Sequence, residues 1–261
     1  MARIFITGSA DGLGKLAAAR LVAEGHRVVL HGRTAQRAAE AMAAVPGAES
    51  ALAGDLSSMA QTRALADQVN TIGNVMGRFD AVIHNAGVGY RERQRNATED
   101  GLPLVFAVNT LAPYLLTALI ETPRRLVYLS SGLHRSGDAS LHDLEWRDRA
   151  WSGGQAYADS KLHDALIAFA AARRWPAVRS NALEPGWVPT KMGGKGAPDD
   201  LAAGAATQCW LAVSEEAAAQ VSGEYFYHQQ LREPLAAVRD EAVQERLLAA
   251  CARLSGVKFP V

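Results

Sequence analysis

The chain has 261 residues, of which 49% are hydrophobic and 21% charged, the balance of an ordinary globular domain. Its 27 Lys and Arg match its 27 Asp and Glu, so the net charge gives no reason to expect a nucleic acid or an anionic membrane as partner. Cys209 and Cys251 fit no metal or redox spacing, and no apolar run approaches the ~20 residues of a membrane span, so we expect buried reduced thiols, no metal site, no membrane partner and a cytoplasmic protein.

Apolar runs of strand length alternate along the chain with helical patterns. In chain order we expect strands at Arg3–Thr7, Arg27–Leu30, Ser50–Leu52, Ala81–His84, Arg125–Leu129 and Arg179–Leu183, and helices at Leu13–Glu24, Ala35–Ala44, Met59–Met76, Leu102–Leu119 and Ala156–Arg174. Continuous apolar strands joined by helices are typical of a parallel sheet with helices on both faces. The pattern predicts an α/β fold of the Rossmann type, a doubly wound parallel sheet in one domain spanning residues 1–261.

A glycine-rich segment, TGSADGLG, follows the first expected strand and opens the first expected helix. Gly8 permits the tight turn, Gly12 lets backbone approach a pyrophosphate, and Gly14 allows close packing of the helix. Free N–H groups at the helix N-terminus attract such an anion. We therefore expect a dinucleotide phosphate site rather than a plain turn, with further contacts from Asp11 and Leu13.

The second expected strand runs into His31, Gly32 and Arg33, and no carboxylate stands at its end. A site for NAD normally places an acidic residue there for the ribose 2′-hydroxyl. A guanidinium can instead bind a 2′-phosphate through charge-assisted hydrogen bonds. Arg33 therefore predicts NADP(H) as the cofactor, with the hydroxyls of Ser9 and Thr34 as additional donors.

Tyr157 and Lys161 are four residues apart near the start of an expected helix, so both side chains can point into one cleft. A free phenol has a pKa near 10 and is a poor base at neutral pH, but a neighbouring ammonium favours the phenolate. The pair Ser130 and Ser131 lies at the end of the preceding expected strand. These residue types together suit proton transfer to or from a carbonyl or alcohol oxygen.

The order and spacing of these motifs resemble the short-chain dehydrogenase/reductase family, in its compact single-domain branch. The resemblance extends from Arg3 to about Tyr227. The segments YADSKLHDAL and EPGWVPTKMGG look most like the branch with retinol-dehydrogenase-like and protochlorophyllide-reductase-like members.

The resemblance implies a role for each candidate. Tyr157 would be the general acid/base, Lys161 its electrostatic partner and ribose ligand, and Ser131, rather than Ser130, the clamp on the substrate oxygen. Asn109 would hold a water that links the lysine to solvent. The remaining implied cofactor contacts are Asp55 and Leu56 near adenine, Asn85, Ala86 and Gly87 after the fourth strand, and Pro185, Gly186, Val188 and Thr190 at the nicotinamide.

Together these features predict an oxidoreductase that transfers a hydride between NADP(H) and a carbonyl or alcohol carbon of a small apolar substrate. Two alternatives stay open: a catalytically silent module that senses NADP(H), and a scaffold protein that uses the same fold. Apolar residues surround much of the helix expected at Ala156–Arg174. One face can cover the sheet and another can meet a second copy, so we expect a homodimer or homotetramer.

Overall fold

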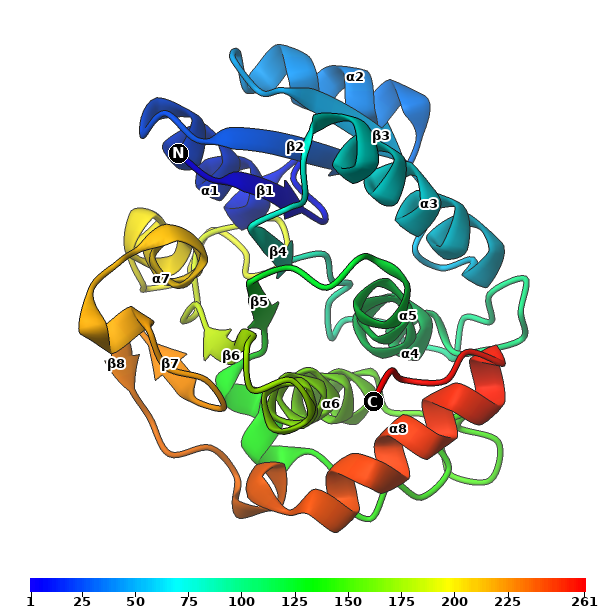
Figure 1. Ribbon diagram of the computed structural model, residues 1–261. Helices are drawn as coiled ribbons and strands as arrows, with labels where there is room; N and C mark the ends of the chain where they lie inside the picture. Colours follow the sequence, from blue (N-terminus) through cyan, green and yellow to red (C-terminus); the bar gives the residue numbers. More distant parts are fainter.

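The computed structural model describes residues 1–261 and is built on one 8-stranded sheet (Figure 1). In spatial order the strands run β3-β2-β1-β4-β5-β6-β7-β8, and only β8 is antiparallel to its neighbour. Their bounds are β1 Arg3–Ile6, β2 Arg27–Gly32, β3 Ser50–Ala53, β4 Ala81–His84, β5 Arg125–Leu129, β6 Arg179–Glu184, β7 Tyr225–Tyr227 and β8 Gln230–Leu231. The order reverses between β1 and β4, which opens a crevice at the carboxyl ends of these strands.

Helices cover both faces of the sheet (Figure 1). One core of 20 buried residues joins it to α1, α2 and α7, and another of 39 joins it to α3, α5, α6 and α8. The helix bounds are α1 Gly12–Ala23, α2 Ala35–Ala44, α3 Met59–Met76, α4 Leu104–Phe106, α5 Ala112–Leu119, α6 Gly153–Arg174, α7 Leu201–Val213 and α8 Glu241–Ser255. The predicted doubly wound α/β fold is therefore confirmed.

The helix expected at Leu102–Leu119 begins at Leu104 and is not α-helical throughout. It consists of α4, a π-helical turn at Ala107–Leu111 and α5. Pro113 has no N–H, so the carbonyl of Asn109 lacks the donor that an α-helix would supply there. A wider turn accommodates this gap, and such turns are frequent at functional sites. The irregular turn places Asn109 fully inside the protein.

The sequence patterns did not predict the elements after β6. The helix α7 is apolar on several sides and shows no clear helical stripe, while β7 and β8 are only 3 and 2 residues long. The helix α8 packs across α6 and α5 on the outside of the molecule (Figure 1). It buries the outer face of α6, where Leu166, Ile167 and Ala170 have no exposed surface. The apolar face of α6 from which we expected contact with a second copy is thus covered within the chain.

Cys209 and Cys251 are both free and buried, as predicted. The helices are each too short or too polar to cross a bilayer. The residues contain no group of three or more His, Cys, Asp and Glu side chains placed to bind a metal ion.

Candidate active site at the carboxyl edge of the sheet

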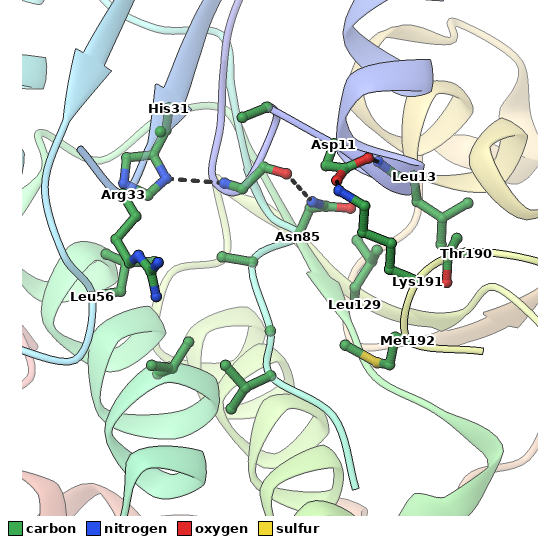
Figure 2. Close-up of a pocket in the computed structure, with 18 of the residues that line it drawn as sticks. Asp11, Leu13, His31, Arg33, Leu56, Asn85, Leu129, Thr190, Lys191 and Met192 are labelled. Carbon is green, nitrogen blue, oxygen red and sulfur yellow. Dashed lines mark hydrogen bonds and ion pairs between the residues drawn. The ribbon is translucent and has the colours of Figure 1, made fainter. Parts of the chain in front are cut away.

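A cleft of about 400 Å³ opens at the carboxyl ends of the central strands, where the strand order reverses (Figure 2). The predicted site residues that line it are Gly8, Asp11, Gly12, Leu13, Arg33, Asp55, Leu56, Asn85, Ala86, Gly87, Tyr157, Lys161, Pro185 and Thr190. Residues that the motifs did not predict line it as well, among them His31, Arg37, Ser57, Val88, Lys191 and Met192. The sequence-predicted candidates outside the lining are Ser9, Gly14, Thr34, Asn109, Ser131, Gly186 and Val188.

The glycine-rich turn is held from two sides (Figure 2). The N–H of Gly8, which has a φ of +64°, donates to Nδ1 of His31 at 3.0 Å. The amide of Asn85 donates to the carbonyls of Thr7 and Gly8 at 2.9 and 3.2 Å. At the start of α1, Asp11 caps the helix by accepting from the N–H of Gly12. These bonds hold the turn in its left-handed conformation. They also keep the start of α1 in place, where free backbone N–H groups can bind an anion.

His31 explains why the turn keeps this shape. Its Nε2 lies 2.8 Å from the carbonyl of Gly54, so the proton sits on Nε2 and Nδ1 is free to accept from Gly8. Burial lowers the pKa of His31, which keeps the ring neutral and preserves this tautomer. Nothing in the sequence distinguishes His31 from an ordinary residue at the end of a strand, because its ring partners lie far away along the chain.

The structure corrects the expectation for Ser9. Its side chain is fully buried, its hydroxyl donates to the carbonyl of Ile6, and it accepts from the N–H of His31 at 2.8 Å. Ser9 therefore joins β1 to β2 and cannot reach a 2′-phosphate. Thr34 lies outside the cleft lining and caps α2 by accepting from the N–H of Arg37.

The guanidinium groups of Arg33 and Arg37 line the cleft at the end that lies next to β2. Arg33 extends beside Leu56, at the opposite end from Thr190 (Figure 2). Arg37, one turn into α2, is paired with Glu40 and lies 3.9 Å from Asp11. Arg33 takes part in neither pair, so its charge is available to a ligand at this end.

Tyr157 and Lys161 project from α6 into the cleft. The ammonium nitrogen of Lys161 lies 5.7 Å from the centre of the Tyr157 ring, and the ring of Tyr90 packs edge-on against Tyr157 at 5.7 Å. The Lys161 ammonium donates to the carbonyl of Leu129 at 2.7 Å and to Asp164 at 2.7 Å. The predicted pair is thus brought together, within reach of the carboxyl end of β5.

The structure distinguishes the two serines after β5. The buried hydroxyl of Ser130 donates to the carbonyl of Lys161 at 2.7 Å, so its proton is used within the fold. The hydroxyl of Ser131 accepts from the N–H of Leu133 at 3.3 Å, which leaves its own proton available. Ser130 lines the cleft and Ser131 does not, but only Ser131 keeps its hydroxyl proton free, and this favours Ser131 as the donor to a substrate oxygen.

His134 is engaged on both ring nitrogens. Nδ1 lies 2.7 Å from the carbonyl of Ser131, and Nε2 accepts from the N–H of Leu235 at 3.2 Å. The hydroxyl of Tyr225 donates to the same Ser131 carbonyl at 3.1 Å. Burial lowers the pKa of His134, which keeps it neutral. His134 thus positions the Ser131 backbone, and it has no free nitrogen with which to move a proton in the reaction.

Asn109 connects three parts of the site. Its side-chain amide accepts from the N–H of Val88 at 2.8 Å and donates to the Val88 carbonyl and to the Ser160 hydroxyl, both at 3.0 Å. The side chain therefore fixes the segment after β4 against α6. Pro113 leaves the backbone carbonyl of Asn109 without its α-helical donor.

The segment after β6 closes the other side of the cleft. Gly186 has a φ of +86°, and a side chain there would meet Asp199. Val188 is buried against Gly204, while Thr190, Lys191 and Met192 line the cleft. Figure 2 shows Lys191 reaching across to Asp11, with which it forms an ion pair. The sequence-predicted carboxamide contact Val188 can thus act only through its backbone.

The chain is similar to known proteins over its whole length. A family model described as short chain dehydrogenase matches residues 2–123. An uncharacterised oxidoreductase of Emericella nidulans is 45% identical over 100% of this chain and 99% of its own length. Retinol dehydrogenase 13 of Homo sapiens is 31% identical over 98% of this chain and 85% of its own. The solved structure of an uncharacterised protein from Mycobacterium paratuberculosis superposes with a TM-score of 0.85 at 25% identity, covering 100% of this chain and 96% of that one.

Proposed function

Because this chain belongs to the short-chain dehydrogenase family, we propose that it transfers a hydride between NADP(H) and a carbonyl or alcohol carbon of a small apolar substrate. The family assignment confirms the resemblance noted in the sequence, including its retinol-dehydrogenase-like branch. The observation that carries the proposal is the meeting of Tyr157 and Lys161 in a cleft whose other end is a glycine-rich helix start.

The cleft fits a dinucleotide. Gly8, Gly12 and Gly87 line it with backbone alone. A Cβ on Gly8 would lie 2.8 Å from the backbone of Ala86, so this close approach of the turn to the segment after β4 requires glycine. The residues that would hold the cofactor are the turn Gly8–Leu13, Arg33, Asp55, Leu56, Asn85–Gly87, Lys161, Pro185, Gly186, Val188 and Thr190. When bound, the nicotinamide supplies or accepts the hydride.

The side chains supply the proton chemistry. In carbonyl reduction the Tyr157 hydroxyl gives its proton to the substrate oxygen, and the Lys161 ammonium stabilises the phenolate that remains. The free hydroxyl proton of Ser131 holds the same oxygen as negative charge develops on it. A water at the Asn109 carbonyl would return a proton toward Lys161. In alcohol oxidation the same groups act in reverse.

A direct assay separates this function from the alternatives. Purified protein is mixed with NADPH and a panel of apolar ketones and aldehydes, and the loss of NADPH absorbance is followed. Turnover of any member supports the proposal, whereas NADPH binding without turnover across the panel favours a sensing module. The substrate surface to probe first is that of Met192, which lines the cleft, and of Tyr90, which packs against Tyr157.

Arg33→Ala is expected to abolish the preference for NADP(H). A charge-assisted contact to the 2′-phosphate contributes about 1.5–3 kcal/mol, roughly ten- to a hundredfold in affinity. NADPH should bind more weakly by that factor, while NADH, which lacks the phosphate, serves as the internal control and should bind as before. Both affinities are measured by fluorescence titration. Equal affinities for NADPH and NADH in the wild type would contradict the assignment.

A further inference from the structure

The ammonium of Lys161 has a buried acidic partner. Asp164 lies three residues further along α6, and its carboxylate accepts from Lys161 at 2.7 Å. The two side chains are only 5% and 3% exposed. No other side-chain or backbone donor bonds this carboxylate, so its interaction with Lys161 is its main compensation for burial.

Because both groups are buried, the charged form of Lys161 and the charged form of Asp164 each depend on the other for stabilisation. Burial lowers the pKa of Lys161, but the Asp164 carboxylate, followed by Tyr157, more than offsets this and the pKa ends above its usual value. Burial also raises the pKa of Asp164 to about 6, although the ammonium acts against it. Above that pH both groups are charged. Removing one partner would leave a charge buried without compensation, which is strongly unfavourable.

The pair also fixes where the ammonium points. An ammonium has three N–H donors. One is given to the carbonyl of Leu129, the last residue of β5, and one to Asp164. The third remains for the cleft, on the side of Gly87, where an added Cβ would lie 3.6 Å from the ammonium nitrogen. The bonds to Leu129 and Asp164 thus hold a charged donor at the edge of the groove.

We propose that Asp164 is a positioning residue of the reaction, which keeps the Lys161 ammonium charged and directed at the place where Tyr157 and the cofactor ribose need it. The inference rests on the proposed function. Asp164 does not line the cleft, so it would act only through Lys161.

Three other titratable groups face the pair. They are Tyr157 on α6, Tyr128 on β5 and Tyr225 on β7. Burial raises the pKa of both Tyr128 and Tyr225 well above the usual value, so these phenols stay neutral. A change of charge at position 164 is therefore felt by Lys161 and, through it, by Tyr157.

Asp164→Asn tests the proposal, because the amide has the shape of the carboxylate and can still accept from Lys161 but carries no charge. Without the carboxylate, burial favours the neutral amine, which stabilises a phenolate poorly. Carbonyl reduction should therefore lose activity at a lower pH, because Lys161 loses its proton earlier. The alkaline limb of the pH–rate profile should shift by about 1–3 pH units toward lower pH. Below a pH of about 6, where Asp164 itself takes up a proton, wild type and variant should converge.

NADPH binding gives a second readout that does not depend on turnover. Titrated from pH 6 to 9, the affinity of Asp164→Asn relative to wild type should fall as the pH rises, because the uncharged amine is a weaker partner for the ribose hydroxyls. Asp164→Glu keeps the negative charge, so the alkaline limb of its pH–rate profile should lie at the wild-type pH. If the amide variant is insoluble, Asp164→Ser replaces it with the same expected shift.

Asp159→Asn is the matched control. Asp159 is a buried carboxylate on the same helix, but it pairs with Arg149 at 2.7 Å instead of Lys161, so its loss should leave the alkaline limb in place. Two results together would overturn the proposal. The rate of Asp164→Asn would be lowered by the same factor at every pH, and the pH dependence of its NADPH affinity would match that of the wild type. Wild-type protein that binds NADPH but turns over no member of the carbonyl panel would instead count against the proposed function, and the two failures are therefore distinguishable.

Discussion

Tyr157→Phe is expected to abolish turnover while NADPH continues to bind. The substitution removes only the hydroxyl that gives or takes the proton, and loss of such a group typically lowers the rate about 10²–10⁴-fold. The ring is nearly buried and packs edge-on against Tyr90 at 5.7 Å, a contact that phenylalanine preserves. Steady-state rates of NADPH oxidation, with NADPH affinity by fluorescence titration, separate the loss of chemistry from a loss of binding.

Thermal unfolding of the variant serves as the control for folding, since an unchanged midpoint shows that packing around Tyr90 survives. A variant that kept more than about a tenth of wild-type turnover would show that the proton comes from another group. His134 could not supply it, because both of its ring nitrogens are bonded to backbone. The effects of Tyr157, Lys161 and Ser131 substitutions should not add, since the three act as a unit.

The features predicted correctly from the sequence are those set by the backbone within a short stretch of chain. The glycines of the turn after β1 and the strand–turn–helix order around them depend on local conformation, so the pattern itself carries the information. The helix α8 could not be placed this way, because its amphipathic pattern does not say that it lies across α6. That packing removed the apolar face from which an oligomer was expected.

Side-chain partners across the fold were the least predictable part. A hydroxyl in a phosphate-binding turn suggests a ligand contact, yet Ser9 points inward because the Ile6 carbonyl and the His31 N–H lie on either side of it. An acid three residues after a lysine on a helix usually indicates a solvent-exposed pair of small energetic weight. Only the burial of Lys161 and Asp164 turns that pattern into a part of the site.

Gly14→Ala is expected to disable the cofactor site. A Cβ at this position would lie 2.4 Å from the amide nitrogen of Asn85 and 2.5 Å from the carbonyl oxygen of Gly8. The Gly8 carbonyl is backbone and cannot swing aside, and Asn85 is the clamp that holds the turn through that same carbonyl. Either the turn opens or α1 shifts, and overpacking of this kind costs about 1–3 kcal/mol.

The distortion falls on the helix start that would receive the pyrophosphate, so NADPH affinity should drop about 5- to 150-fold, the equivalent of that energy. Gly154→Ala is the matched control, because Gly154 lies in the first turn of α6 with nothing within 4 Å of its missing Cβ. There the same added methyl should leave NADPH affinity unchanged and stabilise the protein by about 0.4–1 kcal/mol, since alanine restricts the unfolded chain. Titration and thermal unfolding of both variants give the comparison. Wild-type affinity in Gly14→Ala would mean that the cofactor phosphates do not bind at the turn between β1 and α1.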